Sequence, residues 1–148
     1  MKESLTELES IIIQNLKSTN LLKNEVERKE NEKQDFLKEI SLNIIDIIDS
    51  CENIDEWAID NKYDEVDEAK KINSRYKTIK RKLLALLQKY GVSKIEFPDN
   101  RLIVGLCEVV ETEPDNNRKN DEIITVIRNG YIRGKDLIRP AEIVVVKN

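Results

Sequence analysis

The sequence predicts an α+β protein in which a long helical part comes first and a small β domain comes last. Charged residues make up 36% of the 148 residues and aromatic residues only 5%, which is typical of exposed helices whose apolar residues form a stripe. Residues 1–50 contain neither proline nor glycine. After Gly91 the apolar period changes from about 3.6 to about 2, so a helical domain, 1–90, is expected to precede a β domain, 91–148.

The first fifty residues are predicted to form one helix that pairs with a second copy as a parallel coiled coil. Their apolar residues follow a heptad repeat, and the rest of the chain is too small to cover so long a stripe on a single helix. Asn15 can fix the register, whereas Lys29 and Lys33 place charges in the seam and weaken its middle. The heptad core positions are Leu5, Leu8, Ile12, Asn15, Thr19, Leu22, Val26, Lys29, Lys33, Phe36 and Ile40.

Residues 36–54 are apolar on more than one face, which predicts that this helix packs against several neighbours, as in a bundle. The acidic stretch 55–68 is expected to hold the turn into a second helix, 66–90, with Gly91 as its C-cap. A metal site in that stretch is the weaker interpretation, because acids commonly precede helices for electrostatic reasons. The residues expected at the dimer interface are Leu5, Leu8, Ile12, Leu22, Val26, Phe36, Ile40, Ile44, Ile47, Ile79, Leu83 and Leu86.

The last third of the chain is predicted to be a compact, mostly antiparallel β domain packed on the helices. A long apolar run, 102–110, contains Gly105 as an expected bulge or bend, and a polar loop, 111–121, follows it. The pair Asn129-Gly130 is a hairpin signal between two apolar segments. A β segment of this size is only marginally stable alone, so the helices are expected to support it.

Several functional classes are excluded or disfavoured by composition. The chain contains no histidine, which excludes a histidine zinc ligand and a histidine general base. Its net charge is −4 with acids and bases interleaved, so nucleic acid is not an expected partner. Because no segment resembles an export signal or a membrane span, we expect a cytoplasmic protein with no membrane contact, whose Cys51 and Cys107 stay reduced. No cofactor is expected.

The residues at the end of the chain carry a resemblance to a known family. The stretch 129–146, NGYIRGKDLIRPAEIVVV, resembles the C-terminal signature of GrpE proteins, with a Gly-Tyr pair, a short turn and an Arg-Pro-Ala step into a valine-rich strand. Residues 86–92, LLQKYGV, are similar to the family's helix-to-wing junction, and 44–50, IIDIIDS, resemble its bundle helix. The family's Asp-Pro-x-x-His element is absent and Lys135-Asp136 replaces its usual Asp-Arg, so the resemblance is to a divergent member.

The resemblance implies a non-enzymatic homodimer with paired long helices, a four-helix bundle made of two helices from each chain, and a β-wing on each subunit. GrpE proteins bind the nucleotide-binding domain of a DnaK-type chaperone, open its cleft and promote release of ADP. The resemblance implies the same partner here. It also implies weak contacts at Asn20 and Lys23 on the stem, which is the long N-terminal helix. Residues 123–148 contain five bases and two acids, a net charge of +3 that suits an acidic partner face, although such charges can also protect strand edges. The expected wing contacts are Ile127, Arg128, Arg133, Lys135, Arg139 and Val145.

The weak middle of the coiled coil predicts that the paired helices melt locally on heating, which would make exchange thermally regulated. The principal alternative is a coiled-coil adaptor dimer without exchange activity. A prefoldin-like client-holding chaperone fits less well, because its helices flank the β segment. An enzyme fits least, since no phosphate-binding glycine loop or paired-carboxylate motif is present.

Overall fold

The computed structural model describes residues 2–148, and of Lys2 and Asp64 the backbone alone. It divides into two compact units, Met1–Glu39 and Ile40–Asn148, which are described separately. The helix α1 (Lys2–Asp60) begins in the first unit and ends in the second. The remaining elements are η1 (Tyr63–Glu65), α2 (Asp67–Lys89), β1 (Val92–Lys94), β2 (Cys107–Glu113), β3 (Ile123–Arg128), β4 (Tyr131–Arg133), β5 (Asp136–Arg139) and β6 (Ala141–Val146).

The first unit is helical throughout its described residues. Its charged side chains pair along the helix, with Arg28 bound to Glu32 at 2.6 Å. Lys29, which the heptad pattern places in the seam, lies 3.7 Å from Glu25, one turn earlier on its own helix. Such exposed pairs stabilise a helix by only about 0.3 to 0.5 kcal/mol each. Because these ion pairs contribute so little, most of the stability that this unit could gain would come from burying its apolar side chains.

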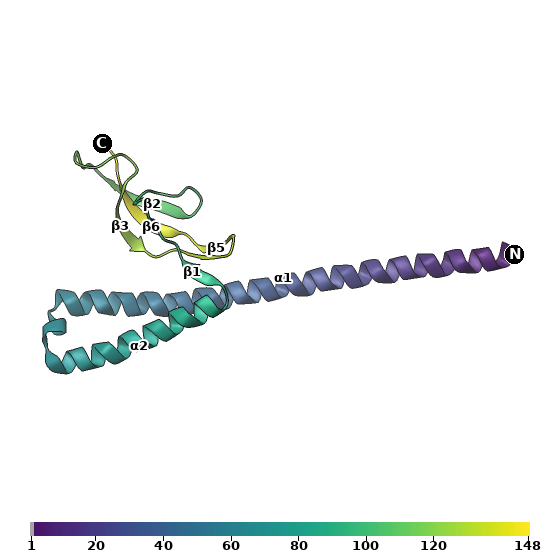
Figure 1. Cartoon of the computed structure of the whole chain (residues 1–148), viewed down its shortest axis with the longest axis horizontal. Helices are drawn as coiled ribbons and strands as arrows, with labels where there is room; N and C mark the ends of the chain where they lie inside the picture. Colours follow the sequence, from purple (N-terminus) through teal and green to yellow (C-terminus); the bar gives the residue numbers. More distant parts are fainter. Residues whose placement is uncertain (1) are drawn as a thin grey trace. The chain divides into compact units, whose positions relative to one another are not determined.

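In the second unit, the last part of α1 and the helix α2 lie side by side as a helical hairpin (Figure 1). Lys80 of α2 bonds to Asp55 of α1 at 2.8 Å, and both side chains are largely buried. The predicted helix 66–90 is present within one residue at each end. Val66 is its N-cap, and the acids Asp67 and Glu68 occupy its first turn, where they favour the positive end of the helix dipole.

Gly91 ends α2 as expected. Its φ of +77° is the left-handed conformation that follows many helices and that glycine adopts without steric cost. The Gly91 amide donates to the Gln88 carbonyl oxygen at 2.9 Å, so one of the orphan carbonyls of the last turn is satisfied. The chain then leaves the helix directly into β1.

The wing, residues 91–148, consists of two three-stranded sheets. The inner sheet has the order β1-β4-β5 and is antiparallel throughout. The outer sheet has the order β2-β6-β3, in which β3 runs antiparallel and β2 parallel to the central β6. The expected α+β class with a mostly antiparallel wing is therefore confirmed. Gly105 lies in the turn that precedes β2, in agreement with a bend.

The predicted Asn129-Gly130 hairpin is wrong. β3 pairs with β6 in the outer sheet, whereas β4 pairs with β1 and β5 in the inner sheet, so the two strands that flank Asn129-Gly130 never pair. Gly130 is needed there because a Cβ would lie 2.4 Å from the Ala141 nitrogen and 2.7 Å from Ile95 Cδ1. The true hairpin joins β4 to β5, and Gly134 turns it with a φ of +59°.

Two separate apolar clusters hold the second unit together. The first contains helix residues and inner-sheet residues, namely Ile45, Ile48, Leu87, Val92, Tyr131 and Ile138. The second lies within the wing and contains Ile123, Ala141, Ile143 and Val145, with Phe97, Leu102 and Cys107 packed against it. The inner sheet is thus anchored to the helices by apolar packing, while the outer sheet has its own core.

Both cysteines are free thiols, with Cys51 buried and Cys107 half-buried. No helix within residues 2–148 is both long enough and apolar enough to cross a membrane.

Candidate functional site

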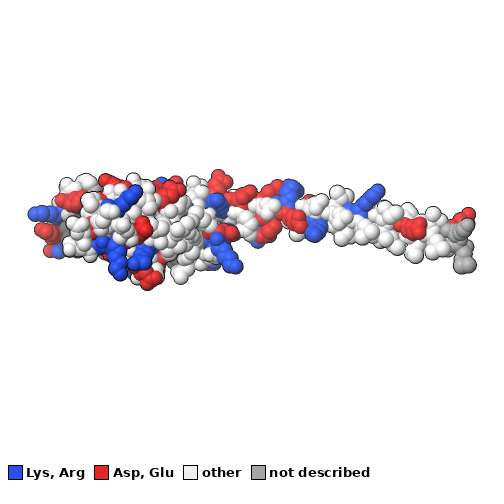
Figure 2. Space-filling model, turned by 90° about the horizontal axis from the view of Figure 1, so that it is seen from above, with Lys and Arg blue, Asp and Glu red and all other residues white. Residues whose placement is uncertain are grey.

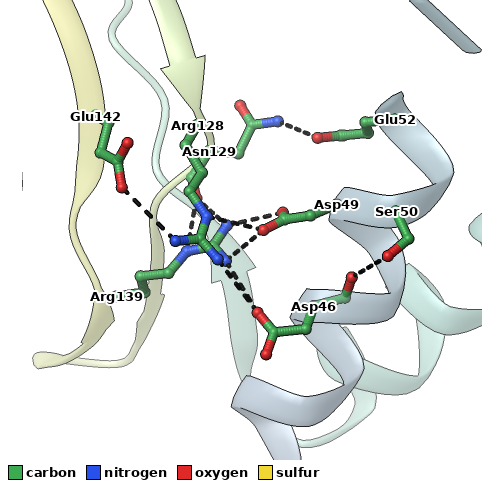
Figure 3. A network of polar contacts seen from close by, with 8 residues as sticks. All are labelled: Asp46, Asp49, Ser50, Glu52, Arg128, Asn129, Arg139 and Glu142. Atoms are coloured by element: carbon green, nitrogen blue, oxygen red, sulfur yellow. Dashed lines mark hydrogen bonds and ion pairs between the residues drawn. The ribbon is translucent and has the colours of Figure 1, made fainter. Parts of the chain in front are cut away.

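A network of polar side chains joins the wing to α1, and we call it the junction (Figure 3). Its members are Asp46, Asp49 and Glu52 of α1 and Arg128, Asn129, Arg139 and Glu142 of the wing. Asp46, Asp49 and Glu52 are spaced by three residues, so they lie on one face of α1. Figure 3 shows them pointing toward the ends of the wing strands.

Arg139, the last residue of β5, is the buried member of the junction. Its side chain is only 10% exposed. NH1 and NH2 donate to the two carboxylate oxygens of Asp49 at 2.6 and 2.9 Å, and NH2 also donates to the Asn129 carbonyl oxygen at 2.6 Å. The guanidinium lies 5.6 Å from the ring centroid of Tyr131. This bidentate geometry fixes both the position and the orientation of the pair.

Arg128, the last residue of β3, bonds to the same carboxylate from the surface. Its Nε donates to Asp49 Oδ2 at 2.9 Å and its NH2 to Asp46 Oδ1 at 3.2 Å. NH1 lies 3.7 Å from Glu142 Oε1. The Arg128 side chain is 42% exposed, so part of the guanidinium remains open to solvent.

The junction shifts the protonation equilibria of its members. Burial by itself would raise the pKa of Asp49, but hydrogen bonds from Arg139 and Arg128 and the charges of both guanidinium groups outweigh it, and the pKa lies below its ordinary value. The hydrogen bond to Asp49 raises the pKa of Arg128 in turn. Burial, together with the carboxylates of Glu52 and Asp49, raises the pKa of Tyr131 to about 12. Asp49 and Arg128 therefore carry opposite charges at neutral pH.

The residues predicted to contact a partner fall into two groups. Ile127 is 60% exposed and lies beside Arg128 at the end of β3. Lys135 is exposed in the β4–β5 turn, and Arg133 is half-buried. On the stem, Asn20 and Lys23 are exposed in the first unit. These residues remain candidates for contact.

Two of the expected wing contacts need correction. Val145 is 3% exposed and belongs to the outer-sheet core, and Arg139 is 9% exposed and is bound to Asp49. Neither side chain presents a surface to a partner in this structure. The expectation for Val145 came from the family resemblance, and the structure buries this side chain because its face of β6 packs against Phe97 and Leu102.

The residues predicted at a dimer interface also differ in their surroundings. Ile44 and Leu83 are partly buried against the apolar cluster of their own chain. The others are exposed by 38% or more, and they are Leu5, Leu8, Ile12, Leu22, Val26, Phe36, Ile40, Ile47, Ile79 and Leu86. So many exposed apolar side chains are unusual for a protein that stays monomeric.

On the face drawn in Figure 2, acidic and basic side chains are interleaved within each unit and are not gathered by sign. Among the described side chains, no group of three His, Cys, Asp or Glu residues is arranged to hold a metal ion.

The family model named GrpE matches residues 1–147. The chain belongs to the GrpE family. Protein GrpE of Wolbachia pipientis subsp. Culex pipiens (strain wPip) is 29% identical over 102 residues, which cover 69% of this chain and 52% of that protein. Protein GrpE of Methanosphaera stadtmanae is 29% identical over 121 residues, covering 81% of this chain and 66% of the relative.

Protein GrpE of Desulfatibacillum aliphaticivorans is 22% identical over 147 residues, which are 99% of this chain and 70% of that protein. Matches to the two Wolbachia relatives span about half of their length. The order of elements in this GrpE family member, a long helix, a second helix and a β-wing, is the order that the resemblance implied.

Sequence reasoning assigned no role to the acidic half of the junction. Asp46 and Asp49 stand in the stretch IIDIIDS that carries part of the resemblance to the GrpE family. The available signal was their spacing. Asp46 and Asp49 are three residues apart, and each follows a buried isoleucine. They therefore lie at the edge of the apolar core, next to the element that packs against it.

Proposed function

We propose that this GrpE family member is a co-chaperone that acts as an adenyl-nucleotide exchange factor. It binds the nucleotide-binding domain of a DnaK-type chaperone, opens the cleft and promotes release of ADP, and it is not itself an enzyme. The observation that carries this proposal is the family match over residues 1–147 on a chain whose wing is mounted on a helical hairpin. The proposal includes a cytoplasmic location.

The physical requirement for exchange is a difference in affinity between two conformers of the chaperone. A factor that binds the open conformer more tightly than the closed one shifts the equilibrium by that difference and by no more. A thousandfold acceleration of ADP release needs roughly 4 kcal/mol of preference. One modest protein interface can supply this amount.

The wing end that contains Ile127 and Arg128 is the surface best suited to this contact. Ile127 offers an exposed apolar side chain, and Arg128 offers a guanidinium whose conformation is already held by Asp46 and Asp49. A held side chain loses little rotamer entropy on binding. Lys135, which is exposed in the β4–β5 turn, adds a positive charge elsewhere on the wing, and Arg133 adds a half-buried one. Asn20 and Lys23 would extend the contact along the stem.

A second copy of the chain is proposed to cover the exposed apolar residues of both units. Burying one leucine or isoleucine side chain contributes about 1.5 to 3 kcal/mol, so the exposed heptad residues together favour association strongly. Residues 1–90 then form the dimerisation module and residues 91–148 the part that contacts the chaperone. Lys29 and Lys33, with ion pairs along their own helix, support a seam whose middle melts first and regulates exchange thermally.

The test is stopped-flow release of fluorescent ADP from the DnaK-type chaperones of the source organism, with and without this protein. Acceleration that saturates with protein concentration is expected with at least one of them. No acceleration with any of them would contradict the proposal, and a dimer in sedimentation would then favour the adaptor alternative. Arg128→Ala is expected to lower the acceleration. Lys147→Ala serves as the control, because it removes one positive charge after the end of β6, outside the junction.

A further inference from the structure

The outer sheet and the inner sheet are attached to the helices by different forces. The inner sheet shares an apolar cluster with α1 and α2 through Val92, Tyr131 and Ile138. The apolar cluster of the outer sheet contains no helix residue among those described. Arg128 connects the outer sheet to α1 through the polar junction instead, and Glu142 of β6 pairs with Arg128 within that sheet.

Asp49 is the centre of that junction. Its carboxylate accepts three hydrogen bonds from charged donors, two from Arg139 at 2.6 and 2.9 Å and one from Arg128 at 2.9 Å. Its side chain is 17% exposed, whereas that of Asp46 is 65% exposed. Water competes far less for Asp49 than for Asp46, so the bonds to Asp49 determine the geometry.

We propose that Asp49 is a positioning residue that sets the direction of the outer sheet and thereby places Ile127 and Arg128 for contact with the chaperone. The functional half of this inference rests on the proposed exchange function, and the geometric half does not. Asp49 touches no partner itself and acts through Arg139 and Arg128.

The geometry explains why one carboxylate can control a direction. Arg139 ends β5 of the inner sheet and Arg128 ends β3 of the outer sheet, so Asp49 ties both sheets to the same point on α1. The bidentate fork of Arg139 restricts rotation about that point, because two parallel bonds must both be kept. Loss of the Asp49 carboxylate leaves Arg128 with two other ion pairs. Its guanidinium nitrogens lie 3.2 Å from Oδ1 of the exposed Asp46 and 3.7 Å from Oε1 of Glu142.

The geometric half is tested on the free protein by residual dipolar couplings of backbone amides. In the wild type, one alignment tensor is expected to fit α2 and the outer sheet together. In Asp49→Asn, the outer sheet is expected to need a tensor of its own while each sheet keeps its internal couplings. Glu56→Gln is the matched control, because it removes one charge two turns further along α1 and outside the junction, and it is expected to keep a single tensor.

The functional half is tested by the plateau of ADP release at saturating factor. Asp49→Asn is expected to lower the plateau about tenfold, equivalent to about 1.4 kcal/mol of lost preference for the open chaperone. A loss of folded protein would instead leave the plateau intact and shift only the concentration needed to reach it. Glu56→Gln is expected to keep the wild-type plateau.

If Asp49→Asn does not fold, Arg139→Lys is measured in its place, since lysine keeps the charge and loses the bidentate fork. It is expected to show a second tensor and a lowered plateau. A single tensor with a wild-type plateau in whichever variant folds would overturn the inference, as would an equal loss in Glu56→Gln. If the wild type fails to accelerate release, the proposed function fails alone, and the tensors still decide the role of Asp49.

Discussion

Replacing Gly130 by alanine tests the way in which the two sheets of the wing meet. Gly130 joins β3 to β4, and its backbone does not have the positive φ found at Gly91, Gly105 and Gly134. Alanine is therefore compatible with the conformation itself. The obstacle is space, because the new Cβ would lie 2.4 Å from the nitrogen and 2.9 Å from the Cα of Ala141.

The expected cost follows from which atoms are in the way. Ile95 Cδ1, at 2.7 Å, belongs to a side chain that can rotate. Ala141 is the first residue of β6, the central strand of the outer sheet, so its backbone cannot shift without moving that sheet. Overpacking of this kind costs about 1 to 3 kcal/mol, and the backbone clash places Gly130→Ala at about 3 kcal/mol.

Gly134→Ala is the control for this experiment. A Cβ at Gly134 would meet nothing within 4 Å, and the φ of +59° is the only obstacle, which costs an alanine about 1 kcal/mol. The assay is urea unfolding of the wing, followed through the NMR signals of β6. If Gly130→Ala lost no more stability than Gly134→Ala, the close approach to β6 would be refuted, and a simple turn at Asn129-Gly130 would fit better.

Further predictions concern pH, the helical hairpin and the stem. The pKa of Asp49 is lowered in the folded state, so its contribution to stability is complete above the unfolded carboxyl pKa of about 3.9. That contribution is lost as the pH falls through the lower folded value. Urea unfolding across acidic pH is expected to show this loss in the wild type and not in Asp49→Asn. Lys80→Met leaves the largely buried Asp55 without its partner at 2.8 Å. The free energy of unfolding in urea is expected to fall by about 2 kcal/mol, between the values for exposed and buried ion pairs. A change below about 0.5 kcal/mol would contradict this expectation. Ile12→Asp is expected to weaken dimerisation at least a hundredfold in sedimentation, and an unchanged association constant would remove the N-terminal helix from the interface. Calorimetry is expected to show the stem melting before the bundle, with Lys29→Leu raising only the first transition; a single transition in which all helix is lost would exclude the thermal role.

The elements that the sequence predicted well are those that depend on neighbours along the chain. The α2 helix was predicted within one residue at each end, because its first acids and Gly91 act within one turn of helix. The long apolar repeat likewise predicted a helix over the first fifty residues, although α1 continues to Asp60, and the change of period predicted a β domain after the helices. Each of these signals is a local preference that needs no knowledge of what packs against it.

The errors concern contacts between distant segments. Asn129-Gly130 has the composition of a tight hairpin, yet the strands on either side join different sheets, and only the approach of Ala141 explains the glycine. Val145 was expected at the wing surface from the family resemblance, yet it is buried, because its face of β6 packs against Phe97 and Leu102. A strand's own residues do not reveal which neighbours will cover it.

The junction shows the same difference between signals that are local in the sequence and contacts between distant segments. The residues of 44–50 and of the closing stretch were sufficient to indicate the family, but they did not indicate that Asp49 and Arg139, ninety positions apart, form a bidentate pair. Helix, strand and cap preferences are set over a few residues, where the chain's own covalent geometry keeps the interacting groups close. The partners of Asp49 are brought together only when the wing folds back onto α1, and that step depends on the packing of the whole second unit.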